Sequence, residues 1–455
     1  MKNYIRITTI TGLFLLATAS CKKFVAVDPP GNELTTETVF SDSVNARHAL
    51  TGIYIGMMEA TLGFGSGGIT LHAGLSADEL KVTPDNPPAY EFFDNHIDPL
   101  NENNYALWFQ AYELIYKANA CIEGIEGSTG ISGHAMNSLV AEAKTLRAFF
   151  YFNLVNLYGA VPLLTTTDYS TNKAAVRTEP ALVYAQVEQD LRFARQYLEK
   201  DALQPGMVSY YAATALLAKV LLYQQQYDQA RQMADEVITS GLFQLEANPA
   251  GVFTTGSQET IWALVPVVPG RETWEGYSFL PGAPDIVPPY IITDTLFNVF
   301  EPGDNRKEQW ISVNIIDGIA YPYPYKYKNA ESGIGTPEQY TVLRLAEQYL
   351  VRAEAAVQLG DLAAATADVN LVRQRAGLGD MPVGDKSMVL DAIARERRSE
   401  LFCEWGNRWF DLKRTGKADA VLSGLKPGWA GTAKLFPIPQ LELTADPNLV
   451  QNPGY

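Results

Sequence analysis

The sequence has few of the residues that metal centres and nucleic-acid surfaces require. Its 455 residues include three cysteines and four histidines, and the histidines have no metal-ligand spacing. HExxH, GxSxG and CxxC motifs are absent. Only 35 residues are basic against 51 acidic ones, a net charge of −16, whereas nucleic-acid binding needs a basic patch. We therefore expect no nucleic-acid partner, no cofactor and no metal. The histidines, which we expect in loops or at the surface, are His48, His72, His96 and His134.

Two patterns resemble enzyme sites, but neither predicts one. The segment 63–68 satisfies GxGxxG, yet it follows an expected helix rather than a strand and has no βαβ unit around it. Glu301 and Asp304 imitate a glycosidase pair, although such pairs arise by chance among 51 acidic residues. The sequence therefore predicts no catalytic residue and no enzyme. A glycan hydrolase on a helical scaffold remains an alternative.

The first 31 residues predict export and a lipid anchor. Lys2 and Arg6 precede an apolar run, 7–17, that is too short to span a bilayer permanently. Small residues then lead to Cys21, the pattern of a lipoprotein cleavage site. We expect a signal peptide over 1–20, lipidation at Cys21, a Pro-Pro-Gly tether over 21–31 and a single domain over 32–455. Cys121 and Cys403 lie in apolar helical patterns and are expected to be buried thiols.

Helical periodicity dominates the body, so the fold class is all-α. Expected helices cover 43–58, 102–122, 137–158 and 180–198. Two later segments, 216–241 and 349–377, repeat one another as a helix, a tight turn and a second helix rich in small residues. In our alignment Asp228 matches Asp361, Ala230 matches Ala363 and Ala234 matches Ala367. This pattern is typical of a tetratricopeptide-like scaffold of stacked helical hairpins, and 137–198 is a further candidate hairpin.

Two segments without helical periodicity, 62–100 and 243–339, are rich in proline and aromatic residues and are expected to form the ligand face. Sugar rings bind best to an exposed aromatic plane flanked by polar groups. The leading candidate is Trp274; weaker ones are Trp310 and the segment Tyr321–Tyr325, which is alternatively a strand packed on the scaffold. The full set of expected ligand-binding residues is Arg271, Trp274, Glu275, Tyr277, Asp78, Asp85, Asn86 and Tyr90.

Several long motifs occur in one order along the chain and together resemble the SusD/RagB family. The longest is AEAKTLRAFFYFNLVNLYGAVPL at 141–163. The others are RLAEQYL (344–350), VRQRAG (372–377), ERRSELF (396–402), RWFDLKR (408–414), PIPQLE (437–442) and QNPGY (451–455). Their charged residues stand beside aromatic stripes on expected helices, which favours internal ion pairs over ligand contacts. These residues are Arg147, Arg397, Arg398, Glu400, Arg408 and Asp411, while Trp108 and Trp409 are expected in the core.

The resemblance implies a lipoprotein of the outer membrane, exposed at the cell surface, that binds an oligosaccharide and delivers it to a SusC-like TonB-dependent transporter. Binding of a peptide, as implied by the RagB branch, is an alternative ligand. A third hypothesis is an assembly protein that uses its repeats to hold partners without any small ligand.

Overall fold

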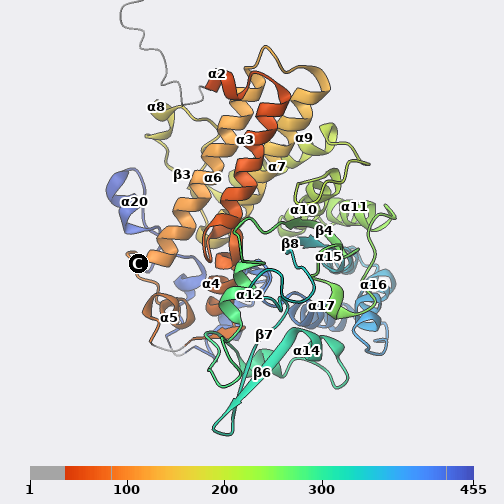
Figure 1. Ribbon diagram of the computed structural model, residues 1–455. Helices are drawn as coiled ribbons and strands as arrows, with labels where there is room; N and C mark the ends of the chain where they lie inside the picture. Colours follow the sequence, from red (N-terminus) through yellow and green to blue (C-terminus); the bar gives the residue numbers. More distant parts are fainter. Residues whose placement is uncertain (1–35, 83–84, 427) are drawn as a thin grey trace, which may run out of the picture.

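The computed structural model describes residues 36–82, 85–426 and 428–455 of the chain (Figure 1). The expected signal peptide, the tether and Cys21 lie outside the described residues. The described part is mainly helical, which confirms the expected fold class. Its long helices are α3 (Ser43–Glu59), α6 (Glu102–Glu126), α7 (Gly133–Tyr158), α9 (Pro180–Tyr197), α10 (Tyr210–Tyr223), α11 (Tyr227–Ile238), α15 (Leu345–Gln358), α16 (Leu362–Arg375) and α17 (Lys386–Leu401).

The long helices form one continuous series of packed neighbours. Helix α3 packs on α6, α6 on α7, α7 on α9, α9 on α10, α10 on α11, α11 on α15, and α15 on both α16 and α17. Helices α7 and α9 make the most extensive contact, so the expected hairpin over 137–198 is present. Stacking of this kind buries an apolar face that no single hairpin buries alone. Among the described residues, no helix has both the length and the apolarity needed to cross a membrane.

The repeat between the last two hairpins is real, but our alignment of it is wrong by two residues. Ala230 and Ala365 are both fully buried at equivalent places, whereas Ala363 is exposed. The turns match in the same register, because Gln225 (φ +59°) and Gly360 (φ +88°) both adopt the left-handed conformation that ends the first helix. The run of three alanines at 363–365 misled the alignment, since alanine occupies both buried and exposed helical positions.

The expectation that 62–100 lacks helices is also wrong. This segment contains a π-turn, η2 (Phe64–Gly68), followed by α4 (Ile69–Ser76) and, after β1 (Leu80–Lys81), by α5 (Pro87–Asp94). Every residue of α4 is buried. A helix surrounded by protein has no polar face and therefore no amphipathic period in its sequence.

The segment 243–339 is built from short elements, in line with its lack of helical period. Strand β5 pairs with β1, which joins this segment to the earlier one, and β4 pairs with β8. Strands β6 and β7 form a hairpin that projects from the body (Figure 1). The elements of this segment are η3 (Pro249–Gly251), β4 (Thr260–Leu264), α12 (Trp274–Phe279), β5 (Ile291–Ile292), α13 (Asp294–Phe297), α14 (Asn305–Trp310), β6 (Ile311–Ile316) and β7 (Ile319–Pro324). Strand β8 (Tyr340–Arg344) begins at the first residue after the segment.

Short elements complete the described chain: α2 (Thr36–Val39), β2 (Val161–Pro162) paired with β3 (Arg177–Thr178), α8 (Tyr169–Asn172), α18 (Asn407–Arg414), α19 (Ala418–Leu422), η4 (Gly431–Lys434) and α20 (Gln440–Ala445). The core includes the expected aromatic residues, since Trp108 is 2% exposed and Trp409 is fully buried. Cys121 and Cys403 are buried free thiols, as expected.

The charged residues of the long motifs form internal ion pairs, as expected. Arg147 of α7 binds Asp190 of α9 through two hydrogen bonds of 2.8 Å. Glu400 of α17 is fully buried and pairs with Arg306, Arg344 and Arg375. Burial opposes the ionisation of Glu400, yet the three guanidinium groups hold its pKa well below the usual range. These pairs connect α17 to β8, α14 and α16.

Candidate functional site

The short helix α12 and the residues just before it place three of the expected ligand-binding residues at least partly at the surface. Its first turn is fixed by Thr273, whose side chain accepts a hydrogen bond from the backbone nitrogen of Gly276. Gly276 is required here, because a β-carbon would stand 2.5 Å from the carbonyl oxygen of Asn329. This close contact presses α12 onto the 328–338 loop. We refer to Arg271, Trp274 and Tyr277 as the α12 surface.

The two aromatic rings of the α12 surface stand at a steep angle to each other. The ring centroids of Trp274 and Tyr277 are 5.6 Å apart and their planes meet at 79°. The indole nitrogen of Trp274 donates to the carbonyl oxygen of Met58 at 2.7 Å, which fixes this half-buried ring against α3. Tyr277 is 43% exposed, and the Arg271 guanidinium lies 3.8 Å from the centre of its ring. The arrangement is a rigid aromatic corner in which Arg271 covers one face of the Tyr277 ring and also pairs with Glu331 at 3.4 Å.

Glu275, which was expected to join this set, faces the interior. Its side chain is 2% exposed and accepts a hydrogen bond of 2.7 Å from the Tyr340 hydroxyl. Burial raises the pKa of Glu275 to about 8. The carboxyl group therefore supports α12 from below, and the α12 surface carries no carboxylate from this helix.

The expected residues of the earlier segment separate into a buried and an exposed group. Asp78 is 3% exposed, and its carboxylate is held by Arg408 at 2.7 Å and by Arg398 at 2.6 Å. Asp85 and Asn86 are exposed, and Asn86 caps α5 by accepting from the backbone of Ala89. Asp78 thus joins the internal ion pairs, while the exposed pair remains accessible at the start of α5.

The structure brings the two expected loops into contact. Strands β1 and β5 pair, with Leu80 opposite Ile292. Burial raises the pKa of Tyr290, which lies just before β5, and the nearby side chain of Asn86 lowers this pKa in part. On its other side, the Tyr290 ring packs edge-on against Phe279 at the end of α12, 5.7 Å between centroids. Tyr290 therefore lies between Asn86 and the end of α12. Tyr90 is half-buried and packs against Phe93 of the same helix, at 5.7 Å.

The weaker aromatic candidates are mainly structural. Trp310 is fully buried, and its indole nitrogen donates to the carbonyl oxygen of Pro249, so the expectation of a ligand platform there is wrong. Tyr321 and Tyr323 lie on β7, opposite Asn314 and Ser312. The prediction of a strand here is confirmed as far as Pro324, but the strand belongs to a hairpin that projects from the body (Figure 1).

One exposed aromatic pair was missed by the sequence reasoning. Phe109 on α6 is 49% exposed, and its ring lies 5.7 Å from that of Tyr105. The adjacent Gln110 accepts a hydrogen bond from the backbone of Phe64 in η2, on which α12 packs. The signal was available in the sequence, because Phe109 falls outside the apolar stripe defined by Trp108, Tyr112 and Ile115.

The residues whose sequence pattern resembled an enzyme or metal site have structural roles instead. Glu301 binds Arg373 and Asp304 binds Arg306, so they form no catalytic pair. Within the described ranges, no three histidine, cysteine or acidic residues are grouped as metal ligands. His72 is buried rather than in a loop or at the surface, and burial lowers its pKa to about 4.

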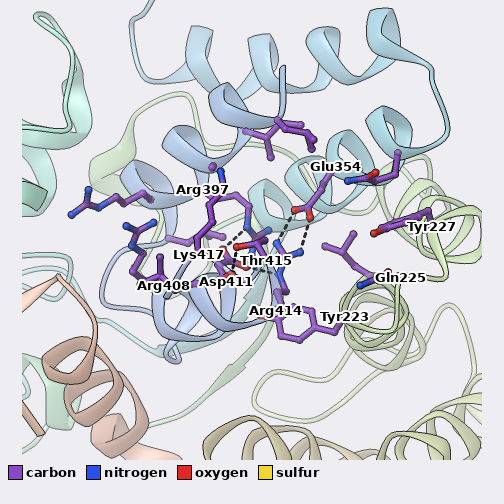
Figure 2. A pocket seen from close by; sticks show the side chains of 18 of the residues that line it. Tyr223, Gln225, Tyr227, Glu354, Arg397, Arg408, Asp411, Arg414, Thr415 and Lys417 are labelled. Atoms are coloured by element: carbon purple, nitrogen blue, oxygen red, sulfur yellow. Dashed lines mark hydrogen bonds and ion pairs between the residues drawn. The ribbon is translucent and has the colours of Figure 1, made fainter. Parts of the chain in front are cut away.

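A separate cavity of about 320 Å³ lies between the α10–α11 turn and helices α15, α17 and α18 (Figure 2). Charged residues of the long motifs line it. Figure 2 shows Asp411 between Arg397 and Arg414, with Glu354 on the far side of Arg414. None of the residues of the α12 surface lines this cavity.

Comparison with known proteins agrees with this architecture. Residues 37–222 match a family model described as "Starch-binding associating with outer membrane", and residues 313–455 match the SusD family model. The chain is 26% identical to SusD-like protein P2 of Formosa agariphila over the full length of both chains. It is 25% identical to SusD-like protein P25 of the same organism, covering 96% of this chain and 97% of that one.

Solved structures share the fold. A laminarin-binding SusD-like protein is 28% identical, with a TM-score of 0.76 over 91% of this chain and all of that one. A SusD superfamily protein from Bacteroides vulgatus, 20% identical, has a TM-score of 0.80 over 91% of this chain and all of that one. A helical-repeat scaffold with these relatives defines a class of non-catalytic binding proteins. The chain belongs to the SusD/RagB family. It is thus a SusD-like glycan-binding protein associated with the outer membrane.

Proposed function

We propose that this protein binds an oligosaccharide at the α12 surface and delivers it to a SusC-like TonB-dependent transporter, while anchored to the outer membrane through lipid on Cys21. The observation that supports the ligand site is the corner formed by Trp274 and Tyr277, with the Arg271 guanidinium over the face of the Tyr277 ring. A sugar ring stacks its C–H face on one aromatic plane, and its hydroxyl groups accept hydrogen bonds from the guanidinium.

Rigidity favours this site over other exposed aromatic residues. Trp274 is held by its hydrogen bond to Met58, and the first turn of α12 is capped by Thr273. A ligand that binds a preformed corner loses little additional side-chain entropy. Stacking of a ring on an aromatic side chain contributes about 1–3 kcal/mol in the comparable case of nucleic-acid bases.

The test of the ligand site is retention in gels that contain laminarin or starch. These glycans are chosen because one relative is named for laminarin binding and one family model is described by starch binding. Tyr277→Ala is expected to weaken binding by about 1–3 kcal/mol, roughly five- to hundredfold in Kd. Tyr169→Ala is the matched control, because Tyr169 is 76% exposed on α8, away from α12. Equal retention of both variants would refute the assignment of the site.

Two further measurements address the ligand class and the absence of turnover. Incubation with either glycan is expected to release no new reducing ends, and product release would instead favour the hydrolase alternative. Retention by neither gel, together with binding of a casein digest, would favour the peptide alternative.

Delivery and anchoring are tested separately. Solubilised outer membranes passed over the immobilised protein are expected to yield a TonB-dependent transporter, identified by mass spectrometry. Cys21→Ser is expected to move the protein from the membrane fraction to the aqueous fraction, since the acyl chains supply the anchor. If no transporter is recovered, the proposal of delivery is refuted. If Cys21→Ser stays in the membrane fraction, the proposal of a lipid anchor is refuted. Neither result bears on glycan binding.

A further inference from the structure

The cavity between the α10–α11 turn and helices α15, α17 and α18 has the dimensions of a small-molecule site. Its volume of about 320 Å³ lies within the range typical of ligand pockets. It is lined by side chains from two different hairpins and from α18, so the fold assembles it from distant parts of the sequence (Figure 2).

The ion pairs at the centre of the cavity leave part of one guanidinium unused. Asp411 accepts from Nε and Nη2 of Arg397 and from Nε of Arg414. Both terminal nitrogens of Arg414 donate to Glu354. Arg414 is thereby satisfied, whereas Nη1 of Arg397 is buried without a hydrogen-bond partner. The Arg397 side chain is 3% exposed, so bulk water does not solvate this group.

Four residues that line the cavity carry buried polar atoms without a partner. Three of these atoms are donors: Nη1 of Arg397, Nε of Arg398 and the hydroxyl of Tyr223. The fourth, Oε1 of Glu79, is an acceptor when ionised. An unpaired buried polar group costs about 1–3 kcal/mol. The surplus of donors means that an occupant supplying acceptor oxygens would remove this cost.

The charges around the cavity also favour an occupant with anionic oxygens. Four guanidinium groups face three paired carboxylates, namely Arg397, Arg398, Arg408 and Arg414 against Asp78, Asp411 and Glu354. Burial raises the pKa of Glu79 to about 7, so this fourth carboxyl balances the excess only in part. Lys417 at the cavity forms its own pair with the exposed Asp391. The lining is therefore electropositive.

We propose that this cavity binds a small molecule with one carboxylate or phosphate group, whose oxygens accept hydrogen bonds from Nη1 of Arg397 and from the Tyr223 hydroxyl. A hydrogen bond from a guanidinium nitrogen to an anionic oxygen is charge-assisted and therefore stronger than one between neutral groups. The site is distinct from the α12 surface and does not depend on glycan binding there.

Tyr223→Phe tests this proposal without removing an ion pair. The ring packs on Phe152, with centroids 5.1 Å apart, and this contact is retained. Because the hydroxyl has no partner in the described structure, its removal is expected to leave the fold intact. Tyr211→Phe is the matched control, since Tyr211 lies on the same helix and packs against Phe243, outside the cavity.

The probes are glucuronate, inorganic phosphate and uncharged glucose, each titrated calorimetrically into the full chain at constant ionic strength. We expect glucuronate or phosphate, but not glucose, to bind the wild type and Tyr211→Phe, and to bind Tyr223→Phe about tenfold more weakly. Binding of glucuronate alone would identify a sugar acid, and binding of phosphate alone a phosphate group; both support the proposal. If neither anion binds, or if Tyr223→Phe binds them as well as the wild type, the cavity holds only water and the proposal is overturned.

Discussion

Replacing Glu275 by glutamine should change how the stability of the protein depends on pH. The carboxyl group lies beneath α12, and the Tyr340 hydroxyl donates to it. Burial is the main cause of its raised pKa of about 8; the nearby Glu404 raises the pKa further, while Lys326 lowers it. At neutral pH the folded protein therefore keeps Glu275 mainly protonated, whereas the unfolded chain ionises it near the ordinary value of 4.5.

The sign of the effect follows from proton uptake. Between about pH 4.5 and pH 8 the folded state binds more protons at Glu275 than the unfolded state does, so its contribution to stability falls as the pH rises. A pKa that moves from 4.5 to about 8 corresponds to a loss of at most about 5 kcal/mol over this range. Glutamine keeps the volume and the acceptor oxygen but does not ionise.

The assay is urea unfolding of the wild type and of Glu275→Gln at about pH 5 and about pH 8. Near pH 5 the two proteins should have similar free energies of unfolding. Near pH 8 the variant should be more stable by several kcal/mol. Other buried carboxyl groups, such as Glu79 and Glu338, also make stability depend on pH, because burial raises their pKa values to about 7. Their contribution is the same in both proteins and cancels when the two free energies of unfolding are subtracted. Parallel stability curves for the two proteins would refute the reasoning.

Three further substitutions test the scaffold. Asp190→Asn leaves the buried charge of Arg147 unpaired and should cost about 3–5 kcal/mol, measured by urea unfolding; a loss no larger than that of Glu113→Gln, in the exposed pair with Lys117, would contradict this. Gly360→Ala places a β-carbon on a residue with φ +88° and should cost about 1–2 kcal/mol, whereas Gln225→Gly at the equivalent turn (φ +59°) should stabilise by a smaller amount. A loss of melting temperature in both turn variants would disprove the equivalence of the two turns.

The expected ligand residues show where prediction from the sequence stops. The aromatic and charged composition of 271–277 indicated a binding loop, and Arg271 and Tyr277 do lie at the surface. Glu275 and Asp78 were expected beside them, but both are buried. Composition identifies which chemical groups a loop contains. It does not determine which side of a short helix faces solvent, because that depends on what packs beneath, here Tyr340 under Glu275.

The sequence by itself determined the long helices and the internal nature of the motif charges. An amphipathic period and a cap are local properties, so α3 and α9 begin at the expected residues, Ser43 and Pro180. Arginine and acidic residues beside aromatic stripes are expected to be buried, and a buried charge is costly unless it is paired. Arg147, which pairs with Asp190, is an example.

Only the tertiary structure decided the rest. Helix α4 has no period to detect, because protein surrounds it on all sides. The register of the repeat depended on which alanine, Ala363 or Ala365, meets the preceding helix. The electropositive cavity depends on Tyr223 and Arg397, which are far apart in the sequence and meet only when the hairpins stack. Local periodicity encodes the frame of this protein, whereas burial and long-range packing decide which of its polar groups a ligand can reach.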